Sequence, residues 1–448
     1  MSKARTLANL ISDNAELADG QISVAEVVGA APTASPTFTG TATVNGNVSV
    51  DGGTIKLDGN YPVGTDNVAL GNNALYSVQS GGNYNVAVGA NAGIAITTGD
   101  FNTAVGYLSA TAITTGERNS AFGSYALRTN ISGANNVANG FQSLYYNTAN
   151  YNTAVGSLSL HSNTTASDNT AVGYQSLSAN TTGGSNTAVG QSALGNNTTG
   201  TRNTALGRTA LQTNTTGNDN TSAGYFSMYR NTTGQLNTAF GSSALEENTT
   251  GANNVALGYK ALEANTTANN NTAVGYESLK DNTTGAEVTS VGYVAATNNT
   301  TANFTTAIGS SSLYKNTTGA ANVAVGAAPL YNNTTGANNI AIGRQALFNN
   351  TTASNNTAVG YQAGYSNTTG TRISAFGRSS LSSNTTGNYN TGLGYYALQA
   401  NTTASYNTAI GHDTMKSLVG GGATNNTAVG ASAMNATTTG ANNSGFGA

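Results

Sequence analysis

The sequence has no cysteine, few charged residues and no long apolar run. Without cysteine, the chain can form neither disulfides nor thiolate metal sites. Charged residues make up 7% of the chain, the formal net charge is −3, and basic residues stand singly, as at Arg118, Arg202 and Lys260. This distribution argues against a nucleic-acid-binding groove, which needs clustered cations. No stretch approaches the roughly 18–20 apolar residues that span a bilayer, so we expect no membrane insertion.

Histidine is scarce too, since His161 and His412 are the only two and lie far apart in the sequence. We interpret both as solvated loop or edge residues, because a metal site needs closely spaced ligands. We therefore expect no metal and no cofactor. The first 20 residues have only scattered apolar positions, which is not the pattern of a secretory signal peptide.

Glycine, in contrast, is abundant and strictly spaced. From Gly156 to Gly411, a glycine that we call position 0 recurs every 17 residues within the unit N-T-A-V-G-Y-Q-S-L-x-x-N-T-T-G-x-x. Such a short repeat indicates a solenoid, and its Thr, Val, Tyr and Ser favour strands over helices. The sequence thus predicts an all-β chain, a parallel β-roll solenoid with one 17-residue repeat per coil.

Three zones follow one another along the chain. Residues 1–30 carry a weak amphipathic helical pattern and form the expected N-terminal attachment segment. Residues 31–64 alternate apolar and polar positions around glycines, which is typical of short strands and turns. Residues 65–448 contain about 23 repeats and form the predicted solenoid.

Several positions of the repeat have a predicted structural role. Position 0 is always glycine, which indicates a bend with positive φ or close packing between coils. The glycine ten residues later is sometimes alanine, as at Ala166 and Ala268, so smallness suffices there. The Asn of each Asn-Thr-Thr triplet is expected to form an amide ladder rather than a glycosylation site. The residues assigned to these ladders and to the apolar columns are Gly173, Gly190, Gly207, Asn180, Asn197, Val172, Val189, Leu177 and Leu194.

Two adjacent apolar columns predict an assembly of chains. Neighbouring strand residues such as Ala171 and Val172 point to opposite faces, so both cannot enter one coil interior. Because a soluble monomer rarely exposes a long aliphatic stripe, we expect one column to fill the coil and the other to contact another chain. The chain is therefore expected to be a homo-oligomer.

The repeat resembles the head repeats of trimeric autotransporter adhesins, through Asn254-Val255-Ala256-Leu257-Gly258 and Asn339-Ile340-Ala341-Ile342-Gly343. That resemblance implies a trimeric left-handed β-roll, although those heads have a shorter coil. Farther upstream, Ser35-Pro36-Thr37-Phe38-Thr39-Gly40 resembles an element of bacteriophage tail fibres. The opening, Ser2 to Leu10, is similar to the start of tail-fibre-like proteins of marine phages, including those of cyanobacteria.

These resemblances imply a structural fibre of a phage virion that attaches to the host cell surface and is not an enzyme. Its partners would be virion tail or baseplate proteins at the N-terminus and a host surface glycan or protein along the rod. Its location would be the virion, outside the cell, and release by lysis would need no signal peptide. Tyrosines after the position 0 glycine are the candidate glycan contacts, although we favour the alternative that they stack on one another along the rod or seal contacts between chains. These residues are Tyr174, Tyr225, Tyr259, Tyr276 and Tyr293.

Three alternatives remain open at this point. The first is a cell-surface adhesin or extracellular filament. The second is a glycan depolymerase, which needs a carboxylate pair. We interpret the clustered carboxylates as a solvated corner instead; they are Glu246, Glu247, Glu263, Glu277 and Asp281. The third is an ice-binding solenoid, which the repeated threonines suggest.

Overall fold

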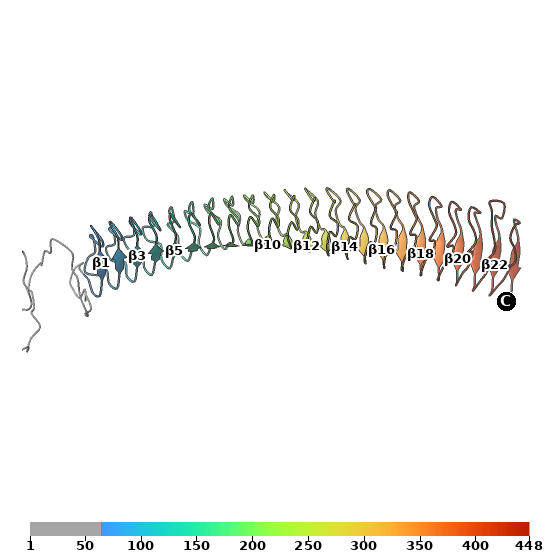
Figure 1. The fold of residues 1–448 in the computed structure, drawn as a ribbon, viewed down its shortest axis with the longest axis horizontal. Coiled ribbons are helices and arrows are strands. Elements are labelled where there is room, and N and C mark those ends of the chain that lie inside the picture. The colour runs from blue at the N-terminus through green and yellow to red at the C-terminus, as the bar shows by residue number, and fades with distance from the viewer. Residues whose placement is uncertain (1–63, 448) are drawn as a thin grey trace, which may run out of the picture. The chain divides into compact units, whose positions relative to one another are not determined.

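The computed structural model describes residues 64–447. The expected helical pattern in residues 1–30, the strands and turns of residues 31–63 and the tail-fibre-like segments lie outside the described residues. Within residues 64–447, the chain forms consecutive coils stacked one behind another along a gently curved axis (Figure 1).

Each coil contributes one three-residue strand, and residues 64–447 contain no helix. The strands are β1 (Val68–Leu70), β2 (Val86–Val88), β3 (Thr103–Val105), β4 (Ser120–Phe122), β5 (Val137–Asn139), β6 (Thr153–Val155), β7 (Thr170–Val172), β8 (Thr187–Val189), β9 (Thr204–Leu206), β10 (Thr221–Ala223), β11 (Thr238–Phe240), β12 (Val255–Leu257), β13 (Thr272–Val274), β14 (Thr289–Val291), β15 (Thr306–Ile308), β16 (Val323–Val325), β17 (Ile340–Ile342), β18 (Thr357–Val359), β19 (Ser374–Phe376), β20 (Thr391–Leu393), β21 (Thr408–Ile410), β22 (Thr427–Val429) and β23 (Ser444–Phe446).

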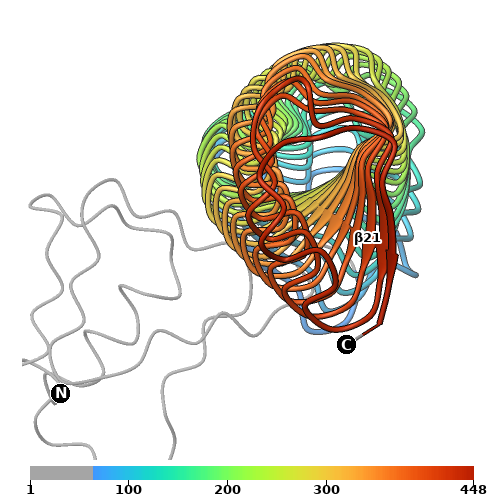
Figure 2. The ribbon, with the colours of Figure 1, turned by 90° about the vertical axis from the view of Figure 1, so that its right-hand side faces the viewer.

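All 23 strands belong to one parallel sheet, in which each strand pairs with the strand of the next coil. Equivalent residues face each other, so that Ala171 pairs with Ala188 and Val172 with Val189. Figure 2, a view along the stack, shows the coils superimposed as a ring with the strands on one side. The predicted all-β solenoid with 17 residues per coil is confirmed.

Backbone hydrogen bonds between coils continue beyond the strands. The Gln175 amide donates to the Ser157 carbonyl of the preceding coil at 3.1 Å. The Leu177 amide donates in the opposite direction, to the Ala193 carbonyl of the following coil at 3.0 Å. Because donors point alternately up and down the axis, the turns are joined coil to coil like the strands.

This alternation requires ordinary residues to adopt left-handed backbone conformations. In the coil of β7, φ is 56° at Gln175, 49° at Leu177 and 59° at Ser185. A left-handed conformation costs an L-residue about 1–2 kcal/mol, yet leucine recurs at the Leu177 position in most coils. Its side chain is fully buried, so burial of apolar area offsets the strain.

The core is a narrow column of small and medium side chains. Ala171 and Leu177 are completely buried, together with their equivalents along the stack. Met228 and Met415 replace leucine in two coils and are also buried. The interior of each coil is therefore filled by side chains of that coil, which are mainly Ala, Leu and Asn.

Departures from the 17-residue spacing fall at the corner that carries the Asn-Thr-Thr triplet in most coils. In the short coil before Gly156, Asn147 Nδ2 donates to the Ala149 carbonyl two residues on. The corresponding bond of Asn163 spans three residues. In the long coil after Gly411, an added Cβ at Gly420 or Gly422 would meet no atom within 4 Å, and β21 and β22 still pair in register. A corner absorbs the change in length, and the sheet is not interrupted.

The position 0 glycine and the glycine ten residues later are expected to respond differently to an added methyl group. Gly173 has a φ of 133°, and a Cβ there would lie 2.6 Å from the Gly190 carbonyl oxygen. Gly183 has no positive φ, and although a Cβ would lie 2.2 Å from the Gly200 oxygen, alanine fills the equivalent position at Ala268 and four other coils. We expect Gly173→Ala to lower the free energy of unfolding by roughly 1–3 kcal/mol and Gly183→Ala by less. Guanidinium denaturation followed by circular dichroism measures both, and equal losses would contradict this assignment of position 0.

Candidate functional site

The outer face of the sheet carries an exposed apolar column. Ala188 points into the coil and is fully buried, whereas Val189 points outward with 39% of its surface exposed. One of the two predicted columns therefore fills the coil, and the other lies on the surface of the chain. We call the second the outer apolar column; its most exposed members include Leu70, Phe122, Val189, Leu206, Phe240, Ile308, Ile342, Phe376, Leu393 and Ile410. Soluble monomers rarely expose such a continuous apolar stripe.

The asparagines of the Asn-Thr-Thr triplets form a buried amide ladder. Asn180 Nδ2 donates to Asn163 Oδ1 at 2.8 Å, and Asn197 Nδ2 donates to Asn180 Oδ1 at 2.8 Å. Asn180 Nδ2 also donates to the Gly183 carbonyl at 2.9 Å, which closes its own corner. These side chains are fully buried in the folded coil, so their role is structural.

A second asparagine ladder precedes most of the strands, and the sequence analysis missed it. The Asn186 backbone amide donates to Asn169 Oδ1 at 2.9 Å, and Asn186 Nδ2 donates to the Gly200 carbonyl at 2.9 Å. Both asparagines are fully buried. The signal was present in the sequence, because asparagine opens nearly every N-T-A-V-G segment.

Threonine hydroxyls make a third ladder. Thr181 Oγ1 donates to the Thr198 carbonyl at 3.0 Å, and Thr198 Oγ1 donates to the Thr215 carbonyl at 3.0 Å. The first threonine of most triplets is thus bonded to the next coil. In the triplet that begins at Asn180, Thr181 is half-buried and Thr182 is exposed at the corner. Because the first threonine hydroxyl is used within the fold, fewer hydroxyl groups remain for the regular exposed array that the ice-binding alternative needs.

The five candidate tyrosines are exposed, but several stack on each other along the axis. Ring centroids are 5.3 Å apart for Tyr259 and Tyr276 and 5.5 Å apart for Tyr276 and Tyr293. Tyr225 contacts Phe226 edge to face at 4.2 Å. In the coils beside Tyr174, the equivalent residues are Ser157 and Gln191, so no tyrosine adjoins it in this column.

Stacking changes what these tyrosines can bind. Both ring faces of Tyr276 are occupied by its neighbours, so its edge and hydroxyl remain for a ligand. A hydrogen bond with the Glu277 carboxylate raises the pKa of the Tyr276 phenol. Sugar stacking, which needs a free face, is open to Tyr174 and to the outer face of Tyr293. Lys260 Nζ lies over the Tyr259 ring, 5.7 Å from its centroid.

A further aromatic column, absent from the sequence analysis, lies five residues after the position 0 glycine. Tyr314, Tyr331, Phe348 and Tyr365 stack over four successive coils, with centroid distances of 5.1, 5.1 and 5.3 Å. These side chains are half-buried. The column stabilises neighbouring coils and covers the corner above Leu313 and its equivalents.

Two of the five carboxylates considered for glycan cleavage lie in ion pairs. Glu247 is 3.0 Å from Arg230, and Glu263 is 2.9 Å from Lys260. The hydrogen bond to Glu263 raises the pKa of the Lys260 ammonium. Burial raises the pKa of the Asp281 carboxyl.

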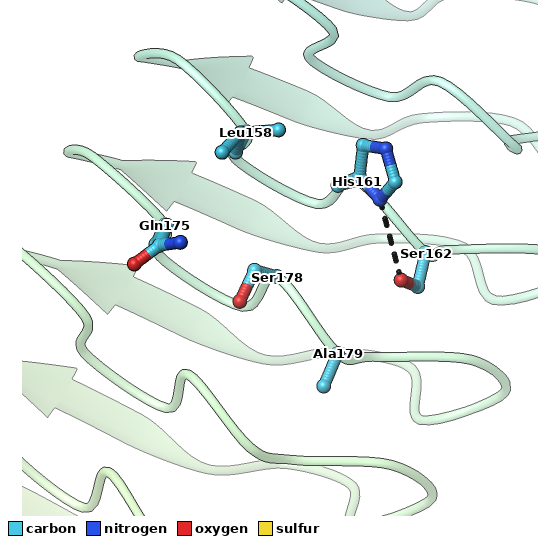
Figure 3. A pocket seen from close by; sticks show the side chains of 6 residues that line it. All are labelled: Leu158, His161, Ser162, Gln175, Ser178 and Ala179. Atoms are coloured by element: carbon cyan, nitrogen blue, oxygen red, sulfur yellow. Dashed lines mark hydrogen bonds between the residues drawn. The ribbon is translucent and has the colours of Figure 1, made fainter.

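A shallow, open depression of about 260 Å³ lies on the surface beside β6 and β7. Figure 3 shows its lining, which contains one titratable side chain, His161. The lining residues are Leu158, His161, Ser162, Gln175, Ser178 and Ala179. Burial lowers the pKa of His161, and its ring stacks on Tyr145 at 5.3 Å. The depression arises where Ser178 follows the larger His161 in the stack and Ala179 follows Ser162.

Residues 64–447 contain no cluster of three or more His, Asp or Glu side chains that could hold a metal ion. Within the same residues, no helix has the length and apolar character needed to cross a membrane. In comparisons with protein-family models, curated protein sequences and solved structures, nothing matches the chain.

The buried amide ladder predicts a large effect of a single truncation. Asn197→Ala removes the bonds that Asn197 makes to Asn180 and Gly200 and the bond it accepts from Asn214. Since the partners remain buried, we expect the free energy of unfolding to fall by roughly 1–3 kcal/mol or more. Thr199→Ala, at the exposed position of the same triplet, should change it by less than about 0.5 kcal/mol. Chemical denaturation of the two variants compares them directly, and similar losses would rule out a stabilising ladder.

Proposed function

We propose that this chain is a non-enzymatic structural fibre of a phage virion that attaches the particle to the host cell surface. The observation that carries the proposal is the stacking of 23 nearly identical coils, which repeats one surface along a rod. A fibre needs length, stiffness and repetition, and parallel coil-to-coil pairing supplies them. The phage assignment rests on the resemblance of the N-terminal segments.

Repetition also gives such a fibre its mode of binding. Each coil offers similar side chains at the same position, so weak contacts with a repetitive host glycan add when several engage together. The exposed tyrosines and the cations beside them are the side chains available for such contacts. Attachment by this route requires no catalytic residue.

The outer apolar column supports a homo-oligomer as the functional unit. Covering this stripe with equivalent stripes of other copies would remove its members from water. The number three comes from the resemblance to trimeric adhesin heads. In this assembly each chain keeps its own closed core, and the oligomer adds an interface outside the coils.

The phage assignment is tested by locating the protein. Antibodies against the purified chain, detected with gold particles in electron microscopy, should label the tails of virions that encode it. Labelling of the surface of the cells instead would favour the alternative of a cell-surface adhesin or extracellular filament. Unlabelled virions would overturn the proposal.

The oligomer is tested by sedimentation equilibrium. We expect a mass near three times the chain mass of 44.8 kDa. Val189→Asp, Phe240→Asp and Ile308→Asp together should leave the β-sheet circular dichroism unchanged and shift the mass to the monomer, because these outward side chains do not fill the coil. Aspartate at Thr199, Thr250 and Thr318, three exposed corner positions, is the control with equal added charge and should remain oligomeric. A wild-type monomer, or an oligomer unaffected by the first set, would contradict this interface.

A further inference from the structure

The Lys and Arg side chains differ along the solenoid in whether acidic residues lie near them, which the net charge of the chain does not show. In the first half of the solenoid, Arg202 is 2.6 Å from Asp219 and Arg230 is 3.0 Å from Glu247. Arg128 and Arg208 lie over tyrosine rings instead. Residues 288–412, in contrast, contain no aspartate or glutamate. The four basic residues of that segment are Lys315, Arg344, Arg372 and Arg378.

Two of these arginines lie in one continuous column with aromatic rings. Arg344, Tyr361, Arg378, Tyr395 and His412 directly follow the position 0 glycine in five successive coils, after β17 to β21. The Tyr361 ring lies between two guanidinium groups, 5.9 Å from Arg344 Cζ and 5.5 Å from Arg378 Cζ. We call this set the arginine–tyrosine column.

The column continues beyond Arg378. Arg378 Cζ is also 5.7 Å from the Tyr395 centroid, and Tyr395 stacks on His412 at 5.1 Å with nearly parallel planes. Both arginines are exposed, and within residues 64–447 neither has a carboxylate at ion-pairing distance. The nearest acidic group in the sequence, Asp413, is engaged by Lys416 at 3.1 Å and by His412 at 3.4 Å.

Contact with tyrosine rings holds each guanidinium group in place, with one ring beside Arg344 and two beside Arg378. The N–H donors at the guanidinium edge remain for a ligand, and they match the two oxygens of a carboxylate. Because side-chain freedom is already restricted, little further ordering is needed when an anion binds. The column is therefore a set of fixed cations that lacks its anions.

The spacing of the cations indicates the shape of the ligand. Arg344 and Arg378 are two coils apart, which is roughly 10 Å at the usual strand spacing of about 4.8 Å. That distance is close to the length of a disaccharide unit in an extended polysaccharide. Tyr361, between them, offers a hydroxyl and a ring edge to the intervening sugar.

Nucleic acid fits the column less well. Single strands are held by bases stacked on free aromatic faces and by cations that follow every phosphate. Here the faces of Tyr361 are covered by two arginines, and alternate positions lack a cation.

We propose that the arginine–tyrosine column binds an extended acidic polysaccharide that carries about one carboxylate per disaccharide and lies along the solenoid axis. The proposal rests on the proposed attachment function and specifies its ligand class. The column lies just after the glycine bend, beyond the strand residues that form the outer apolar column.

The test is binding of the whole chain to immobilised hyaluronan, which has one carboxylate per disaccharide, with neutral dextran as the uncharged probe. We expect hyaluronan binding that weakens as salt is raised. Arg344→Gln with Arg378→Gln should lower the affinity about tenfold or more, because a lost charge-assisted hydrogen bond weakens binding by roughly that factor. The matched control, Lys315→Gln with Arg372→Gln, removes the same charge from the same segment outside the column and should change the affinity less than about twofold.

Four results would overturn the proposal: no hyaluronan binding, equal binding of dextran, equal losses in the two double variants, or tighter binding of single-stranded DNA. The labelling of virions is independent of these measurements. A chain that is present on virions but does not bind hyaluronan overturns the ligand class alone. Hyaluronan binding by a chain that is absent from virions supports the column and overturns the phage assignment.

Discussion

Within residues 64–447, backbone hydrogen bonds join each coil to its neighbours along the stack. The strands account for three residues per coil, and the turns add bonds such as Leu177 to Ala193 and Gln175 to Ser157. A coil therefore has to repeat the path of its neighbour, and the strict 17-residue spacing follows from that need. The same requirement explains the left-handed leucines, because a turn whose donors point alternately up and down the axis needs alternating backbone handedness.

Stacking also permits a polar interior. A single buried amide is costly, but an amide that repeats at the coil spacing has a donor and an acceptor on its neighbours. Asn180 bonds to Asn163 and to Gly183, and Asn186 bonds to Asn169 and to Gly200, so four interior contacts of this coil are hydrogen bonds. These ladders make up for the small number of large apolar side chains, and they close each coil without help from another chain.

The sequence was sufficient to predict the features that recur at fixed spacing. The 17-residue coil, the all-β class and the opposite orientation of Ala188 and Val189 follow from period and strand geometry alone. The left-handed backbone of Leu177 was not predictable, because leucine has no intrinsic preference for it and only the stacked neighbours enforce it. The rings of Tyr259, Tyr276 and Tyr293 were considered as sugar platforms, but sequence spacing alone does not say whether neighbouring rings cover each other's faces. In the structure they do, at 5.3 and 5.5 Å.

Because equivalent residues of successive coils are neighbours, a surface feature of this protein is a column rather than a loop. A substitution at an exposed position leaves the buried ladders unchanged. The same kind of side chain at one repeat position in several successive coils forms a continuous strip on the surface. Six acidic residues lie between Glu246 and Glu287, at several positions of the repeat, whereas residues 288–412 have none. Tyrosine stacked on tyrosine gives a strip of ring edges, and tyrosine stacked on arginine gives a strip of fixed cations. The backbone pairing that fixes the coil therefore also fixes the spacing of any ligand groups along the rod, and an extended polymer is the class of ligand that can match such a spacing over several coils.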